Sequence, residues 1–359
     1  MKKLKLICVC VLAVLTALTA AGCHKKDEIA VKTGNIKFTS AYYMCALINA
    51  DNEAKSKVKE ELDDDESTED IDYYSKKIDG KKFVKWVEDT ALENVKKIAA
   101  YKTLCKKADL ELDEETESNV DSYVEYYWTN YGYSQYYEPN GVSKETYAKY
   151  MKDAYYSNLY FEHLYGEGGE KEISAEDVKA ATFENFVLAD KLEADFSSKT
   201  DEEKASLKEQ FNSYVTALNS GEKTFEEVYK EYNGTTDTEE TEETDSEELK
   251  PVNKYASVLG TEDTGYASDY FDDASEMAVG EVKLIELDDD AGLVLLVKRD
   301  LAADEYYVKN LDLSSRHLLK DDEYEDFIED YVKKMDFDIS NYAIRRFKVK
   351  NIAEPSATA

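Results

Sequence analysis

The chain has 359 residues, and its 79 aspartates and glutamates outnumber its 45 lysines and arginines to give a formal net charge of −34 at pH 7. This charge argues against a nucleic-acid partner, because phosphates demand a basic surface. The length allows two or three domains, and the low content of glycine and proline with frequent helical periodicity indicates a mostly helical protein.

The N-terminus has the pattern of a secretory signal. Three lysines precede an apolar run, Leu6 to Ala17, that is too short to span a membrane as a resident helix, and Ala20-Ala21-Gly22 then lead to Cys23. We predict a lipoprotein signal peptide at 1–22 and diacylation of Cys23, with 23–35 as a lipidated N-terminus and polar tether. The alternative is a plain signal peptide with an incidental cysteine. Loss of the three signal lysines changes the formal charge from −34 to −37 (−34 − 3).

Residues 36–175 are expected to form a lobe of helices. Residues 51–72, rich in lysine and acid, are expected to be a solvated loop, because they lack the central glycine and regular acid spacing of an EF-hand calcium site. Ser174, followed by Asp177, caps the entry into the next domain. The pattern predicts a short strand or turn at Ile36, a helix capped by Thr39 or Ser40, an amphipathic helix from Lys82 to Lys107, a helix capped by Asp113, and a helix from Lys144 to Tyr165 capped by Ser143.

Three cysteines remain outside the signal, namely Cys23, Cys45 and Cys105. If Cys23 carries lipid, one pair is left, and a disulfide between Cys45 and Cys105 is possible. Both lie on apolar faces of predicted helices, which favours buried free thiols. No CxxC or Cys/His zinc spacing occurs, so we expect no metal site.

Residues 176–300 show a different pattern. The segment 234–250 holds eight acidic residues and one lysine without an apolar period, so we predict a disordered insertion. Around it we expect a strand-like run from Ala181 to Ala189, a helix ending at Gly221, a second helix opened by the capping box of Thr224 and Glu227, and a hairpin from Leu284 to Val297.

Residues 301–352 are expected to hold a C-terminal helix with one apolar stripe, from Tyr324 to Met335. We expect 311–336 to pack on the helical lobe, 37–166, and not on 178–299. An extended basic segment, Tyr342 to Ile352, follows and is expected to lie against the acidic body. Residues 353–359 are a tail.

The order of elements in 176–300, with Phe271 and Val279-Gly280-Glu281-Val282 before the last hairpin, resembles the parvulin-type peptidyl-prolyl isomerase domain. The helical blocks before and after it resemble the lobe of PrsA/SurA-type foldases. The resemblance covers most of the chain and implies an α+β fold. In that fold a mostly helical chaperone lobe, split between N-terminal helices and a C-terminal helix, carries an inserted parvulin-like domain.

The resemblance also implies that the catalytic machinery is degenerate. In active parvulins the first strand carries a His-Ile-Leu pattern, and Asn185-Phe186-Val187 aligns with it here. A later strand carries a Tyr-His-Ile pattern, and Leu293-Val294-Leu295 aligns with that. No histidine occurs between 178 and 299, so the degenerate positions are Asn185 and Val294 and no catalytic residue is assigned. No cofactor is expected.

The favoured function is a membrane-anchored extracytoplasmic chaperone that holds unfolded or newly secreted polypeptides, with little isomerase activity. Tyrosine and tryptophan suit such binding because they offer apolar contact at low entropy cost, although core packing accounts equally well for the dense aromatic run Tyr123 to Tyr137. The client-binding candidates are Phe186, Phe271, Met277 and Leu295 in the central domain, and Tyr126, Tyr127, Trp128, Tyr131 and Tyr133 in the lobe.

Two alternatives stay open. An active isomerase could work without histidine, because rotation about an imide bond breaks no covalent bond and faces a barrier of roughly 18–20 kcal/mol. A surface or solute-binding lipoprotein is the other alternative. A binding lipoprotein usually shows repeated strand–helix alternation, which this chain lacks.

Overall fold

The computed structural model describes residues 27–60, 71–234 and 250–353, and the fold is α+β, as predicted. The chain divides into two compact units. We call Met1–His163 with Glu323–Ala359 the helical lobe, and Leu164–Asp322 the sheet domain. These boundaries differ from the predicted ones, since the end of one long helix and the start of another belong to the sheet domain. In the described ranges, none of the helices combines the length and hydrophobicity that a membrane span requires.

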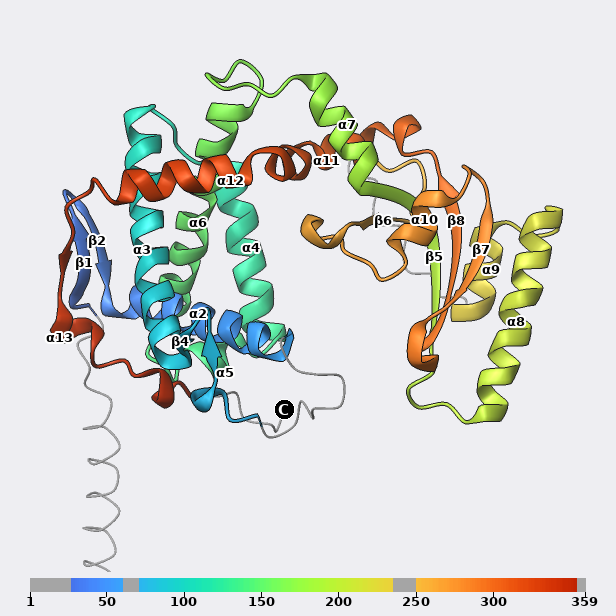
Figure 1. Cartoon of the computed structure of the whole chain (residues 1–359), viewed down its shortest axis with the longest axis horizontal. Helices are drawn as coiled ribbons and strands as arrows, with labels where there is room; N and C mark the ends of the chain where they lie inside the picture. The colour runs from blue at the N-terminus through green and yellow to red at the C-terminus, as the bar shows by residue number, and fades with distance from the viewer. Residues whose placement is uncertain (1–26, 61–70, 235–249, 354–359) are drawn as a thin grey trace, which may run out of the picture. The chain divides into compact units, whose positions relative to one another are not determined.

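The helical lobe is built from long helices and short strands. In Figure 1 the helices α3, α6 and α4 run alongside one another, and ion pairs link α3 to α6 and α6 to α4. A small antiparallel sheet has the order β2-β1-β9. The elements of the helical lobe are β1 (Ile29–Thr33), β2 (Ile36–Thr39), α2 (Ser40–Glu60), η1 (Tyr73–Ser75), β3 (Lys77–Ile78), β4 (Lys81–Lys82), α3 (Phe83–Lys107), α4 (Glu114–Asn130), α5 (Tyr133–Tyr137), α6 (Lys144–Tyr165), the C-terminal part of α12 (Asp312–Val332), β9 (Asp338–Ile339), α13 (Asn341–Ile344) and η5 (Val349–Asn351).

Side-chain caps begin the lobe's helices where the sequence predicted them. Thr39 Oγ1 accepts from the backbone N–H of Tyr42 at 3.2 Å, and the Asp113 carboxylate accepts from Thr116 N–H at 2.7 Å. Such caps satisfy N–H groups that have no partner within the helix. The predicted loop at 51–72 is wrong over its first part, because α2 continues to Glu60. Ala54 and Val58 extend its buried stripe, and 61–70 lie outside the described residues.

The helices of the lobe bury a common core and the carboxylates of Asp51 and Asp153. On the apolar face of the predicted amphipathic helix α3, Phe83, Val87 and Val95 are fully buried. Asp153 of α6 is buried as well, and its carboxylate accepts from the Tyr42 hydroxyl and pairs with two lysines, Lys102 and Lys149. A buried carboxylate needs such partners because burial alone disfavours its charge.

Cys45 and Cys105 are buried free thiols, as predicted. The Cys45 thiol donates to the carbonyl of Ala41, and burial raises the pKa of the Cys105 thiol to about 11. Both thiols therefore stay protonated at neutral pH and are poor nucleophiles.

The sheet domain centres on a four-stranded sheet with the order β6-β5-β8-β7, in which every neighbouring pair is antiparallel. The predicted hairpin from Leu284 to Val297 is confirmed as the pair of β7 and β8. The elements are α7 (Ala175–Asn185), β5 (Phe186–Asp195), α8 (Asp201–Ser220), α9 (Phe225–Asn233), β6 (Ala256–Gly260), η2 (Glu262–Thr264), α10 (Phe271–Glu276), β7 (Val282–Glu286), η3 (Asp288–Asp290), β8 (Gly292–Arg299), η4 (Leu301–Ala303), α11 (Glu305–Asn310) and the N-terminal part of α12.

The predicted strand from Ala181 is partly wrong, because residues up to Asn185 belong to α7. Ser174 caps this helix, and its buried residues Val178, Ala181 and Thr182 follow helical spacing. The predicted helix end at Gly221 and the capping box of Thr224 and Glu227 are both confirmed. Of the predicted acidic insertion, 235–249 lie outside the described residues.

The predicted C-terminal helix, α12, makes different contacts along its length. In the helical lobe, Tyr324 OH donates to the carbonyl of Ser157 at 2.8 Å, and Phe327 stacks on Tyr160. The expectation that 311–336 avoids the sheet domain is wrong for its first turns, since Leu311 packs with Phe186 in that domain's core. The predicted extended segment Tyr342 to Ile352 instead begins with the helical turn α13 and includes η5, because Ser340 caps the backbone N–H of Ala343.

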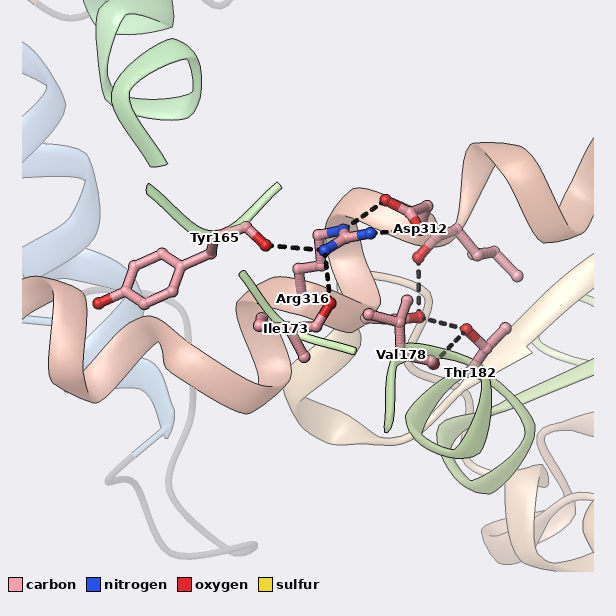
Figure 2. Close-up of polar contacts among 8 residues, drawn as sticks. Tyr165, Ile173, Val178, Thr182, Asp312 and Arg316 are labelled. Carbon is pink, nitrogen blue, oxygen red and sulfur yellow. Dashed lines mark hydrogen bonds and ion pairs between the residues drawn. The ribbon is translucent and has the colours of Figure 1, made fainter. Parts of the chain in front are cut away.

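Arg316 ties the first turns of α12 into the sheet domain (Figure 2). Its guanidinium donates to the carbonyls of Tyr165 at 2.7 Å and Ile173 at 3.4 Å, and it pairs with Asp312 at 2.7 Å. The side chain is only 8% exposed. Removing it would take a donor from both carbonyl groups and the ion-pair partner from Asp312, although the Tyr165 carbonyl would still accept from the backbone N–H of Ile173 at 3.1 Å.

We expect Arg316→Ala to lower the free energy of unfolding by about 2–4 kcal/mol, because a buried charged donor and its partners lose their hydrogen bonds. Urea unfolding measures this as a lower midpoint. The control is Lys309→Ala, an exposed position on α11, which should change stability by less than about 0.5 kcal/mol. A midpoint for Arg316→Ala equal to that of the control contradicts the prediction.

Candidate functional site

The first degenerate position, Asn185, does not face an open site. It is the last residue of α7 and not part of a strand. Its Nδ2 donates to the carbonyl of Ala181 at 2.9 Å, and its Oδ1 accepts from the hydroxyl of Thr261 at 3.3 Å. The amide therefore joins the end of α7 to the loop after β6, which is a structural use of both its donor and its acceptor.

The second degenerate position, Val294, is fully buried in the middle of β8. Its neighbours across the ladders are Glu193 on β5 and Ile285 on β7. The same face holds Val187, Ala189, Leu259 and Leu296, and Tyr270, Ala274 and Met277 pack onto it from α10 and the residues flanking it. This face of the sheet is filled by the protein's own side chains.

Tyr270 is the polar group nearest this packed face. Its hydroxyl donates to Glu193 Oε1 at 2.8 Å. Burial first, and then the Glu193 carboxylate, raise the pKa of Tyr270 well above its ordinary value. The phenol therefore stays neutral at physiological pH and cannot act as a base.

The four candidates of the central domain do not share one cradle. Met277 packs on the face that holds Val294, and Phe271 packs partly against the same cluster. Leu295 lies on the opposite face beneath α8 and α9, and Phe186 belongs to a third cluster with Leu311. The prediction of a common lining is corrected here, because successive residues of a strand point to opposite faces of its sheet.

An open pocket of about 430 Å³ lies beside this packed face. Its loop is tight, since a Cβ on Gly260 would lie 2.0 Å from Thr264 Oγ1. Of the four candidates only Phe271 lines the pocket, and in the described ranges no cluster of His, Cys, Asp or Glu is arranged to hold a metal ion. The pocket is lined by Thr261, Glu262, Asp263, Ala267, Ser268, Asp269, Phe271 and Asp272.

The lobe candidates do come together, on α4, α5 and the turn between them. Tyr127 contacts Tyr131 with ring centroids 4.9 Å apart and Tyr133 at 5.4 Å, and Tyr126 contacts Tyr131 at 5.3 Å. Tyr123 joins them, 4.1 Å from the ring of Tyr127. We call Tyr123, Tyr126, Tyr127, Tyr131 and Tyr133 the tyrosine surface.

Three members of the tyrosine surface are well exposed, with exposed fractions of 41% for Tyr123, 51% for Tyr126 and 59% for Tyr131. The hydroxyls of Tyr126 and Tyr131 lie 3.5 Å apart, and this contact raises the pKa of Tyr126. Partial burial raises the pKa of Tyr123 to about 12. These rings remain neutral at physiological pH, so the surface is both aromatic and uncharged.

Buried aromatic rings hold the tyrosine surface in place. Tyr133 contacts Tyr137 and Tyr147, and both of these are buried. Trp128 packs against the same two rings and is only 8% exposed, so its assignment as a client-binding residue is corrected. It faces the core because it follows Val120 and Val124 at spacings of four residues on the buried stripe of α4.

Sequence reasoning left Tyr123 out of the candidates. The spacing of Tyr123, Tyr127 and Tyr131 by four residues is the signal that could have found it, because such residues stack along one helix face. The neighbouring exposed residue Tyr155 is 42% exposed on α6, and its proximity also raises the pKa of Tyr123.

No protein-family model and no curated protein matches this sequence. Among solved structures, the chain is similar to the foldase protein PrsA from Streptococcus pneumoniae, with 13% identity, a TM-score of 0.42, and coverage of 75% of this chain and 96% of that one. It is also similar to the foldase protein PrsA from Lactococcus lactis, with 11% identity, a TM-score of 0.38, and coverage of 88% and 96%.

A third similar structure is the peptidylprolyl isomerase PrsA from Bacillus cereus, with 15% identity, a TM-score of 0.24, and coverage of 72% of this chain and 88% of that one. All of these TM-scores are below 0.5. The function proposed below therefore rests on the side chains of this protein and on its sequence motifs.

We expect Val294→His to lower the free energy of unfolding by about 2–4 kcal/mol, because the imidazole would enter a packed apolar face without a partner. Burial would hold the pKa of that histidine below its ordinary value of about 6.5, so the folded state would bind fewer protons than the unfolded state. The loss of stability should therefore grow as the pH falls through that value. Urea unfolding at several pH values measures it.

The matched control for this change is Val279→His, at a position that is 62% exposed. It should shift stability by less than about 0.5 kcal/mol and show little dependence on pH. A Val294→His protein as stable as this control, with accelerated prolyl isomerisation, contradicts a filled face.

Proposed function

We propose that this protein is an extracytoplasmic, lipid-anchored chaperone of the foldase type, which holds unfolded or newly secreted polypeptides and has little isomerase activity. The observation that carries the proposal is the tyrosine surface, in which three exposed rings are held by half-buried and buried ones. The resemblance of the sequence to PrsA/SurA-type foldases supports the same role.

The chemistry of the tyrosine surface suits binding without a fixed client sequence. Aromatic rings bury a large apolar area, and their hydroxyl groups keep the surface compatible with water when no client is bound. Tyrosine also loses little side-chain entropy on binding, and rings that already lean on one another lose less. The formal charge of −34 would keep client-bound proteins apart by repulsion.

The second candidate function is prolyl isomerisation at the acidic pocket. Phe271 could pack against a proline ring there, beside Ala267 and the hydroxyl of Ser268. No histidine lies in that part of the chain, and the filled face around Val294 leaves the pocket as the open place for a substrate in the described part of the sheet domain. Holding of clients is favoured because the tyrosine surface presents three exposed aromatic rings, whereas Phe271 is the one aromatic residue that lines the pocket.

Membrane attachment is proposed through a thioether-linked diacylglyceryl group on Cys23, which lies outside the described residues. The support is the order of lysines, apolar run and Ala-Ala-Gly-Cys in the sequence. We expect mass spectrometry of the protein isolated from bacterial membranes to find an N-terminal peptide that begins at lipid-modified Cys23. An unmodified terminus, or one that begins at another residue, removes the anchor from the proposal.

We expect the chain from residue 24 to suppress the aggregation of an unfolded client and to accelerate proline-limited refolding very little. The double variant Tyr126→Ser/Tyr131→Ser should weaken client binding about tenfold, because two aromatic contacts worth roughly 0.5–1.5 kcal/mol each are lost. Titration of a permanently unfolded client, followed by fluorescence anisotropy, measures the affinity.

The matched control is Tyr266→Ser/Tyr342→Ser, which removes two tyrosines of similar total exposure, 41% and 71%, outside the tyrosine surface. It should bind the client as the unchanged chain does. Equal loss in both double variants contradicts the tyrosine surface as the binding site. Refolding accelerated as strongly as by an active parvulin favours the isomerase, and absence of any client binding leaves a surface lipoprotein.

A further inference from the structure

Basic residues are concentrated in two segments of this acidic chain. Residues 340–353 contain two arginines and two lysines and no aspartate or glutamate. Residues 73–82 contain four lysines and a single acid, Asp79. The whole chain has 79 acidic and 45 basic residues, whereas each of these two segments has more basic than acidic residues.

The fold of the helical lobe brings these two segments together. Val349 and Ile352 bury their side chains in the same core as Ile78 and Phe83, and Lys350 Nζ lies 5.0 Å from the ring centroid of Tyr74. Figure 1 shows the dark red segment after α13 running to the end of the lobe that holds β4. The basic end, as we call it, consists of Lys76, Lys77, Lys81, Lys82, Arg345, Arg346, Lys348 and Lys350.

The cations of the basic end divide into those that already have a partner and those that form no ion pair. Arg346 pairs with Glu28, and Lys81 lies 3.8 Å from Asp89. In contrast, Lys77, Lys82, Arg345 and Lys348 are exposed and form no ion pair with any described residue. The expectation that the C-terminal basic run lies against the acidic body is therefore met by Arg346 alone.

Two exposed tyrosines accompany these cations. Tyr342 is 71% exposed, and the guanidinium of Arg346 lies 4.4 Å from its ring centroid. Tyr74 is 41% exposed beneath Lys350. Tyrosine with lysine or arginine is the combination that anchors protein surfaces at lipid headgroups, where the ring enters the interface and the cation meets phosphate.

The basic end also lies where the N-terminal part of the chain leaves the fold. The carbonyl of Glu28 accepts from the backbone N–H of Ser40 at 2.7 Å, and the Glu28 carboxylate pairs with Arg346 of the basic end. Cys23 precedes Asp27 by four residues, which reach at most about 14 Å when extended. If Cys23 carries the lipid proposed above, Asp27, the neighbour of the Glu28 that pairs with Arg346, stays within that reach of the anchor.

From this placement we infer that the basic end is a membrane-docking surface, which binds the anionic headgroups of the bilayer that anchors the chain. The inference uses the proposed anchor to explain orientation, but the surface itself is independent of the lipid. Docking would turn the acidic remainder of the helical lobe away from like-charged headgroups. A membrane-proximal lysine or arginine strengthens binding to an anionic bilayer about fivefold, and the effect fades with salt.

The test uses the chain from residue 24, which keeps every described element and lacks the lipidated residue. Co-sedimentation with vesicles of mixed phosphatidylglycerol and phosphatidylcholine should exceed that with phosphatidylcholine alone, and salt should abolish the difference. The variant Lys82→Gln/Arg345→Gln/Lys348→Gln/Lys350→Gln should lose at least about tenfold in vesicle affinity. Circular dichroism verifies that this variant is folded.

The matched control is Lys59→Gln/Lys199→Gln/Lys309→Gln/Lys334→Gln, which removes four exposed lysines elsewhere and gives the same net charge. Retained binding by the control, with loss in the basic-end variant, supports a docking surface. Equal loss in both variants, or no preference of the unchanged chain for anionic vesicles, overturns it. Because the assay contains neither lipidated Cys23 nor a client, its outcome is separate from the tests of the anchor and of client holding.

Discussion

The burial of β8 on both faces is the constraint on which the sheet domain depends. Residues Gly292 to Val297 are all buried, with Leu293 and Leu295 beneath α8 and α9 and Val294 and Leu296 beneath α10. A central strand with two apolar faces stabilises the domain through the area that it removes from water. It also leaves no room for a substrate at Val294, the degenerate position on this strand. The packing that stabilises the domain therefore also fills the face that holds this position.

In the helical lobe, the tyrosine surface exposes aromatic rings to solvent. The division of aromatic residues along α4 explains how the lobe offers such a surface without losing its core. Val124 and Trp128 face inward, while Tyr123, Tyr126 and Tyr131 face outward and lean on rings that are partly or fully buried. Rings held in this way would need no rearrangement for the client binding proposed above, which would reduce the entropy that such binding costs.

Charge is distributed as unevenly as aromatic residues are. The net charge of −34 favours solubility and separation of neighbouring proteins, yet residues 341–353 carry only positively charged side chains. This segment is fixed by Val349 and Ile352, whose side chains enter the lobe core, so its arginines and lysines are held at one end of the lobe. This grouping of cations is the feature on which the proposed docking to an anionic bilayer rests.

The amino-acid sequence by itself determined the local features whose causes are local. Thr39, Asp113 and Thr224 cap helices where they were expected to, and the apolar face of α3 is buried as its spacing predicted, because capping and amphipathic periodicity involve residues within a few positions of one another. The hairpin of β7 and β8 follows in the same way from its turn residues.

Only the tertiary structure decided which aromatic and apolar residues are exposed. Phe186 and Leu295 look as suitable for binding as Tyr126 or Tyr131 in the sequence, but both are buried against elements far away along the chain. The helical identity of Ala181 to Asn185 and the meeting of Lys350 with Tyr74 also depend on such distant neighbours. Burial is a property of what packs on a residue, and packing partners separated by more than a hundred residues leave no periodic signal in a single sequence.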